Sequence, residues 1–124
     1  MGGVLFMFKY SLHYLSKSNA FGTPDYCTMF SNGIYQGFFT EYRYYMVNSI
    51  MKIFMVKMNL SSKPVVFHYS AGELMLQPGQ SKVSSYIWRI PYDCKPGYYC
   101  IEGYDDSDEL RNNKFYIPVT ILGV

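Results

Sequence analysis

The sequence predicts an all-β domain, an antiparallel β-sandwich of about seven to nine strands. Three observations favour this fold class. Aromatic residues make up 19% of the chain, with 14 Tyr and 9 Phe, and such side chains suit pleated, half-buried surfaces. Apolar residues recur mostly at every second position, which is the period of a strand. Turn-forming residues separate these runs. The length of 124 residues is typical of one domain, so we expect a single domain over 1–124.

The first predicted strand is VLFMFKYSLHYL (4–15), which alternates loosely and is apolar enough on both faces to suggest burial. A short segment, CTMFSNG, follows and ends in Asn32-Gly33, a dipeptide typical of hairpin turns. The segments 34–47 and 49–60 then read as two strands, or as one long strand with a bulge or bend near Asn48-Ser49.

A helix is the competing interpretation for residues 44–58, which are rich in Met and Lys. At helical spacing Met46, Ile50, Ile53 and Phe54 would share one face. No N-cap residue with a following Glu or Gln precedes the segment, however, and its neighbours favour strands. As a strand it carries Ile53, Met55 and Lys57 on one face.

Turn signals become clear from residue 59 onward and mark off five further strands. The expected strands are 64–71, a short strand within GELMLQPGQ (72–80) that ends at Pro78-Gly79, 81–90, 98–104 and 114–124. The dipeptides Pro78-Gly79 and Pro96-Gly97 mark two of the turns between them. Pro118 lies inside the last strand and lacks an N–H to donate, which indicates an edge position or a bulge.

The stretch IPYDCKPGYYCIEGY (90–104) raises the choice between a metal or redox site and a structural corner. Counting by twos from the turn puts Tyr99 and Ile101 on the core side and Cys100 on the opposite face. Tyr99 then suits a tyrosine corner, with its hydroxyl bonded back to the turn backbone. We expect the core to contain a set of five apolar residues. These are Phe67, Trp88, Tyr99, Ile101 and Val119.

The spacing of Cys94 and Cys100 does not suit a zinc knuckle, and no His follows Cys100 as in a blue-copper site. A local Cys94–Cys100 disulfide, pairing of either residue with Cys27, and three thiols all remain open.

The acidic loop, Asp105, Asp106, Asp108 and Glu109, lacks the glycine and the regular alternation of an EF-hand, so a solvated loop is expected. The chain is predicted to need no metal and no cofactor.

Composition and motifs exclude several classes of function. Net charge is +2 and only 16% of residues are charged, without the basic stripe that nucleic-acid binding needs. No apolar run reaches the roughly 18 residues of a membrane span. No G-x-S-x-G elbow or glycine-rich phosphate loop is present, and His13 and His68 are isolated within predicted strands. The protein is therefore predicted not to be an enzyme.

Asn59-Leu60-Ser61 is a sequon, which makes Asn59 a candidate for glycosylation.

The region 59–124 has a recurring order of turns and core positions. It runs through Asn59, Lys63-Pro64-Val65, Phe67, Leu76, Pro78-Gly79, Trp88, Ile90-Pro91, Pro96-Gly97, Tyr99 and Ile101. This order resembles small immunoglobulin-like domains of the fibronectin-III and cell-adhesion-related kind, and more weakly the BsuPI proteinase inhibitors, which are also β-sandwiches. The resemblance implies an immunoglobulin-like fold and carries almost no function. Residues 1–58 match no named family and are expected to add strands.

Low charge, abundant Tyr and long apolar strands favour a non-enzymatic structural or adhesive subunit that acts by protein–protein contact at a cell surface, pilus or virion. We expect self-association or binding of a protein partner through a β-edge, at the strand 114–124 or at 4–15. An extracellular or virion-surface location is expected, with the cytoplasm as the alternative. The second functional hypothesis is a BsuPI-type proteinase inhibitor that acts through a loop.

Overall fold

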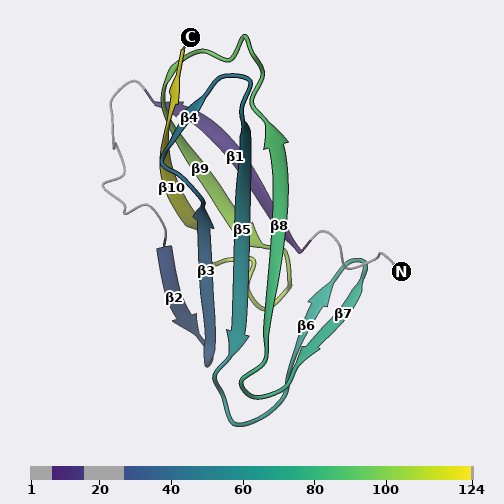
Figure 1. Ribbon diagram of the computed structural model, residues 1–124. Coiled ribbons are helices and arrows are strands. Elements are labelled where there is room, and N and C mark those ends of the chain that lie inside the picture. The colour runs from purple at the N-terminus through teal and green to yellow at the C-terminus, as the bar shows by residue number, and fades with distance from the viewer. Residues whose placement is uncertain (1–6, 16–26, 124) are drawn as a thin grey trace.

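The computed structural model describes residues 7–15 and 27–123, and the fold of this part is all-β, as predicted (Figure 1). Its strands number ten, more than the seven to nine expected. They are β1 (Phe8–Leu15), β2 (Cys27–Ser31), β3 (Ile34–Thr40), β4 (Tyr44–Met46), β5 (Ile50–Asn59), β6 (Val65–Tyr69), β7 (Gly72–Leu76), β8 (Ser81–Arg89), β9 (Gly97–Asp105) and β10 (Phe115–Leu122). None of the described residues forms a helix that is long and apolar enough to cross a membrane.

Two four-stranded sheets face each other. One has the order β1-β9-β10-β4 and the other the order β2-β3-β5-β8, while β6 and β7 form a separate hairpin. All pairings are antiparallel except that of β4 with β10, which is parallel. The chain changes sheets between β3 and β4, so that β3 borders β5 and β4 borders the last strand. This arrangement is an immunoglobulin-like sandwich, and the predicted fold class is confirmed.

The main core lies between the sheets and receives side chains from both. Tyr99, Ile101 and Val119 are buried in it, at 7%, 0% and 2% exposure. Two of the expected core residues differ from the prediction, one in its burial and one in its place. Trp88 is only partly buried, because β8 is the edge strand of its sheet. Phe67 is fully buried in a second, smaller cluster under the β6–β7 hairpin.

Residues 44–58 form strands, so the helical alternative is wrong. The bend expected near Asn48-Ser49 is present, since Asn48 has a φ of 67° in the turn between β4 and β5. Short polar residues such as Asn tolerate this left-handed backbone, which most residues avoid. The turn joins the two sheets, which explains why one continuous strand does not form. The Asn32-Gly33 hairpin is also confirmed, with φ of 51° and 82° at its two central residues.

The strand predicted at 4–15 begins at Phe8 within the described residues, and positions 4–6 lie outside them. Within the single chain this strand is buried on one face only. Phe8, Tyr10 and Leu12 pack against the core, whereas Lys9 and His13 face outward and are exposed. One edge of β1 pairs with β9, and no described strand pairs with the other edge.

Pro118 lies where β10 has one neighbouring strand. The strand pairs with β9 along most of its length but with β4 only from Thr120 onward. The N–H of Thr120 points toward β4 and donates to the carbonyl of Arg43 at 2.9 Å. The nitrogen of Pro118, two residues earlier, therefore points to the same side, where no strand lies opposite it. The edge position expected from this proline holds for the first part of β10 only.

Candidate contact face and buried polar network

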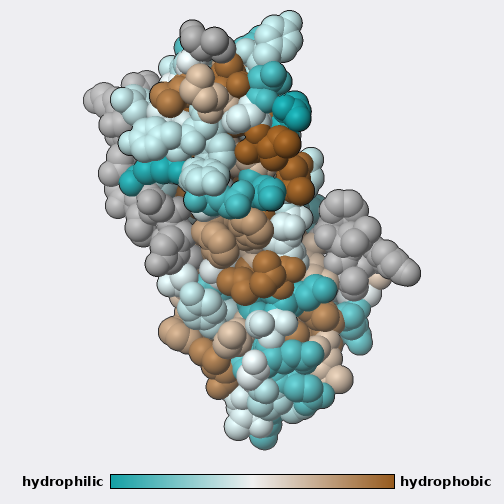
Figure 2. All heavy atoms as spheres, viewed as in Figure 1, coloured by the Kyte–Doolittle hydropathy of each residue, from teal (hydrophilic) through white to brown (hydrophobic). Residues whose placement is uncertain are grey.

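The outward side of the β2-β3-β5-β8 sheet is unusually apolar, and we call it the outer face. Its apolar members are Phe30, Tyr35, Phe39, Ile50, Phe54, Val56, Met58, Val83 and Ile87. The most exposed are Phe30 at 66%, Ile87 at 59% and Val83 at 56%. Figure 2 shows hydrophobic residues along the middle of this face. A sheet with one face in water normally alternates apolar inside and polar outside, so the second apolar layer calls for a covering partner.

A hollow lies near the centre of the outer face, because Gly37 has no side chain there. Its lining includes Tyr35, Phe39 and Val56, and its volume is about 230 Å³. A Cβ on Gly37 would lie 2.9 Å from Cγ1 of Val56. Beside the hollow, the rings of Phe39 and Phe54 stack across the strand pair with centroids 5.2 Å apart. The outer face therefore combines flat aromatic surface with a recess that a protruding apolar side chain would fill.

The turn before β9 is a structural corner. The hydroxyl of Tyr99 donates to the carbonyl of Lys95 at 2.6 Å, as expected for a tyrosine corner. Burial, with a further contribution from the neighbouring thiol of Cys94, raises the pKa of Tyr99 to about 12. Cys94 and Cys100 are thiols, so neither residue forms a disulfide. Neighbouring residues of a strand point to opposite faces, so Cys100 points away from the side of β9 that carries Tyr99. Cys94 packs against Tyr99, and the two thiols therefore lie on opposite sides of the strand.

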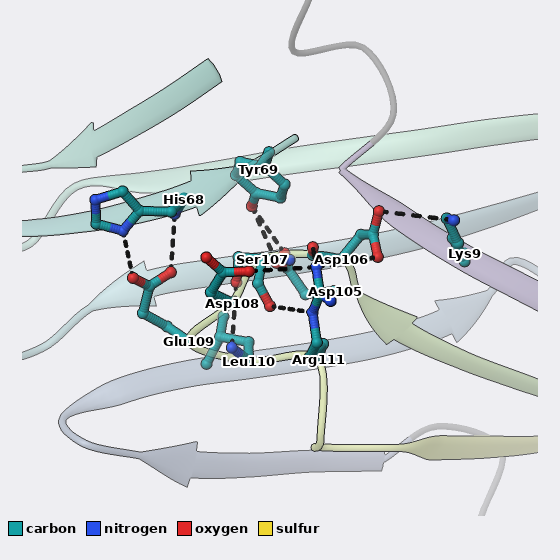
Figure 3. A network of polar contacts seen from close by, with 10 residues as sticks. All are labelled: Lys9, His68, Tyr69, Asp105, Asp106, Ser107, Asp108, Glu109, Leu110 and Arg111. Atoms are coloured by element: carbon teal, nitrogen blue, oxygen red, sulfur yellow. Dashed lines mark hydrogen bonds and ion pairs between the residues drawn. The ribbon is translucent and has the colours of Figure 1, made fainter. Parts of the chain in front are cut away.

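A polar network is buried at the end of the sandwich where the β6–β7 hairpin joins it. Nζ of Lys57 on β5 donates to Oδ2 of Asp105 on β9 at 2.9 Å, and the two side chains are 2% and 0% exposed. The Tyr69 hydroxyl, on β6, lies 3.0 Å from Oδ1 and 3.2 Å from Oδ2 of the same carboxylate (Figure 3). The network therefore joins both sheets and the hairpin. Burial raises the pKa of Tyr69, which keeps its hydroxyl protonated as a donor.

The remaining acidic residues after β9 are exposed or half-buried and lie beside cations. Asp106 lies near Lys9 and Arg111, and Asp108 lies 3.4 Å from Arg111. Asp105 differs from the expected solvated loop because it is wholly buried. Among the described residues no group of three or more His, Cys, Asp or Glu side chains is arranged to hold a metal ion.

His68 lies between two carboxylates. Its Nδ1 contacts Oε2 of Glu109, its backbone N–H donates to Oε1 of Glu109 at 2.8 Å, and its Nε2 lies 3.3 Å from Glu73 (Figure 3 shows the Glu109 contacts). The hydrogen bond that the His68 ring donates to Glu109 raises the pKa of His68. Partial burial acts to raise the pKa of Glu109, but the hydrogen bonds that it accepts from His68 outweigh burial and lower this pKa. The pair fastens the hairpin to the loop that follows β9.

His13 belongs to a group of Ser, His and Glu side chains, which are the residue types of a serine hydrolase triad. Its Nε2 lies 2.9 Å from Oγ of Ser11 and 3.2 Å from Oε1 of Glu102. A serine nucleophile needs a histidine that contacts the serine through one ring nitrogen and the acid through the other. Both contacts here use the same nitrogen, so this group has no path for proton relay.

Asn59, the candidate for glycosylation, is fully buried. Its Nδ2 donates to the carbonyls of Lys63 at 2.8 Å and Leu76 at 2.9 Å, and its Oδ1 accepts from the N–H of Ser61 at 2.9 Å. A glycan would replace one of the two hydrogens of this nitrogen, so at least one of the first two bonds would be lost. In the folded protein Asn59 instead fixes the turn between β5 and β6 and ties it to β7.

No protein-family model matches the chain, and no curated protein matches it. Among solved structures, it is similar to the CARDB domain of a Pyrococcus furiosus protein, crystallised in complex with di-metal ions. The TM-score is 0.47 at 16% identity, and the alignment covers 95% of this chain and 91% of that one. At this level of similarity we draw nothing about function or metal binding from it. The BsuPI resemblance has no support in these comparisons.

Proposed function

We propose that the protein is a non-enzymatic structural subunit that acts by protein–protein contact, and that the outer face of the β2-β3-β5-β8 sheet makes this contact. The observation that carries the proposal is the apolar character of that face, where Phe30, Val83 and Ile87 are each more than half exposed. Neither strand edge expected from the sequence offers as much apolar surface. Phe8, Tyr10 and Leu12 of β1 point inward, and β10 is covered by β4 at its end.

A second copy of this chain is the occupant that suits the face best. Its two cationic members, Lys52 and Arg89, lie near the same end, because Arg89 pairs with Ile50 at the start of β5. A two-fold axis through the Gly37 hollow would place that end of one copy over the Met58 end of the other. No cation would then face a cation, and the apolar surfaces would cover each other.

The size of the face suits a modest interface. Four strands about 4.8 Å apart, with about seven residues of each at roughly 3.3 Å per residue, give a footprint of roughly 400–500 Å². Protruding side chains add accessible area, so the face approaches the roughly 800 Å² per partner of a standard interface. We therefore expect a dimer that dissociates on dilution rather than a permanent one.

The first test is light scattering of the purified protein over a range of concentrations. The wild type is expected to form dimers that dissociate on dilution. Val83→Lys and Ile87→Lys place a charge in the interface and should give monomers. Tyr92→Lys is the matched control, because Tyr92 is 79% exposed in a turn away from the face. A wild type that stays monomeric at every concentration, or a Tyr92→Lys variant that dissociates equally, contradicts the proposal.

The location we propose is the surface of a cell, pilus or virion, with the cytoplasm as the alternative. Low charge and abundant Tyr support it, since Tyr supplies contact area with a polar end. Labelling intact cells or particles with a membrane-impermeant amine reagent tests it. Exposed lysines such as Lys9 and Lys82 should react without lysis, and labelling only after lysis favours the cytoplasm.

A further inference from the structure

The buried pair of Lys57 and Asp105 holds two opposite charges away from water. Their side chains are 2% and 0% exposed. Removing an ammonium and a carboxylate from water costs several kcal/mol each, and their mutual attraction does not always offset this. A covalent amide between them would remove both charges, since condensation consumes the ammonium and the carboxylate together.

The two oxygens of the Asp105 carboxylate have different hydrogen-bond donors. Oδ1 accepts from the backbone N–H of Ser107 at 3.0 Å and from the Tyr69 hydroxyl at 3.0 Å, and this hydroxyl is slightly farther from Oδ2, at 3.2 Å. Two fixed donors on one oxygen form the arrangement that stabilises the negative oxygen of a tetrahedral intermediate. Oδ2 is instead the oxygen that faces Nζ of Lys57, at 2.9 Å.

The surroundings of Lys57 favour its reaction as an amine. Its Nζ lies 5.6 Å from the centre of the Phe67 ring and 5.4 Å from that of Tyr69. Burial lowers the pKa of Lys57, although the nearby Asp105 opposes this. Two reacting groups held in contact within a folded protein gain a large entropic advantage over the same groups free in solution.

We propose that Lys57 and Asp105 form an intramolecular isopeptide bond between Nζ and Cγ. A proton passes from the ammonium to Oδ2, and the amine attacks Cγ while Oδ1 takes the negative charge. The N–C bond forms, and the bond from Cγ to Oδ2 breaks. Of the three ammonium protons, two leave with Oδ2 as water and one stays on the amide nitrogen. The step needs no oxidant, reductant or added reactant, and it is independent of the contact function proposed above.

The test is the intact mass of the purified, denatured full chain. The expected mass is that of the sequence less one water, and a protease digest should yield the Lys57 peptide joined to the Asp105 peptide. Lys57→Arg and Asp105→Ala should show the full sequence mass. Lys82→Arg is the matched control, because Lys82 is opposite Lys57 on β8 and exposed, so it should still lose water. Tyr69→Phe should slow the loss.

The wild-type measurement decides the question even where a variant fails to fold. A wild type with the full sequence mass and no joined peptide shows an ordinary ion pair and overturns the proposal. Loss of water that persists in Lys57→Arg would also overturn it, because another pair of groups would then be responsible.

Discussion

Gly103 on β9 is the position where one added methyl group should do most damage. A Cβ there would lie 2.3, 2.6 and 2.8 Å from three ring carbons of Phe38 on the opposite sheet. Phe38 has no room to move away, since it is 0% exposed and its ring contacts those of Phe8 and Phe115, with centroids 6.0 and 6.2 Å away. Overpacking of this kind costs about 1–3 kcal/mol, and we expect Gly103→Ala to fall at the upper end.

Gly37→Ala is the matched control, because it is also a strand glycine with one close neighbour. Its added Cβ would lie close to one atom, the Cγ1 of Val56 at 2.9 Å on the outer face, and its next neighbours would be at ordinary contact distances of 3.7 and 3.9 Å. That methyl group can rotate outward, so the expected loss is below about 1 kcal/mol. Phe38→Leu should partly rescue Gly103→Ala by removing the obstructing ring atoms. The double variant should then be more stable than the sum of the single changes predicts.

Urea unfolding at a fixed, low protein concentration measures the stability of all five proteins, which are the wild type, the three single variants and the double variant, and avoids a contribution from assembly. Two results would refute the reasoning. One is a Gly103→Ala variant within about 0.5 kcal/mol of the wild type, which would mean that the two sheets separate easily at Phe38. The other is strict additivity with Phe38→Leu, which would mean that the two residues do not contact each other.

Three further predictions concern the corner, the edge and the hairpin. Trp88→Ala should cost about 2–3 kcal/mol, less than the roughly 3–5 kcal/mol of a fully buried aromatic residue, as measured by urea unfolding. Tyr99→Phe should cost about 1 kcal/mol in the same assay, because the hydroxyl loses its bond to the Lys95 carbonyl. The contact of His68 with Glu109 should stabilise the hairpin most between the ordinary pKa values of 4.5 for Glu and 6.5 for His. Its contribution declines as pH rises through the raised pKa of His68 or falls through the lowered pKa of Glu109. Titration of His68 by NMR should give a lower pKa in Glu109→Gln than in the wild type, and an unchanged pKa would contradict the pairing.

Local signals in the sequence predict the strands and turns well. Asn32-Gly33 and Pro96-Gly97 mark turns whose backbone geometry few other residues adopt, so they remain informative without tertiary context. Counting by twos likewise places Tyr99 and Ile101 inside, because a strand has only two faces.

The sheet partners could not be predicted from the sequence. The choice of β10 as the neighbour of β4 depends on packing across a long sequence separation, and nothing local to residues 44–46 encodes it. The sequence also does not indicate that β6 and β7 form a hairpin outside the two main sheets. This arrangement explains why Phe67 fills a separate cluster although its local pattern resembles that of a main-core residue.

The buried network was missed although a signal for it was present. Lys57 follows Ile53 and Met55 on the inward side of its strand, and Asp105 follows Tyr99 and Ile101 in the same way. Charged side chains at inward positions are normally explained as strand ends that reach water. Opposite charges at two such positions instead indicate that each residue is the partner of the other.

The pairing of β1 with β9 has a consequence for the order in which the molecule is made. His13 and Glu102, which contact each other across these strands, are 89 residues apart in the chain. At ribosomal speeds of about 5–20 residues per second, β1 waits roughly 5–20 s for its partner to be synthesised. Phe8, Tyr10 and Leu12 stay uncovered during this interval, and a neighbouring nascent chain that has already completed β9 offers them the same edge. Among the described strands β1 therefore waits longest for its partner, and crowded synthesis favours its exchange between copies.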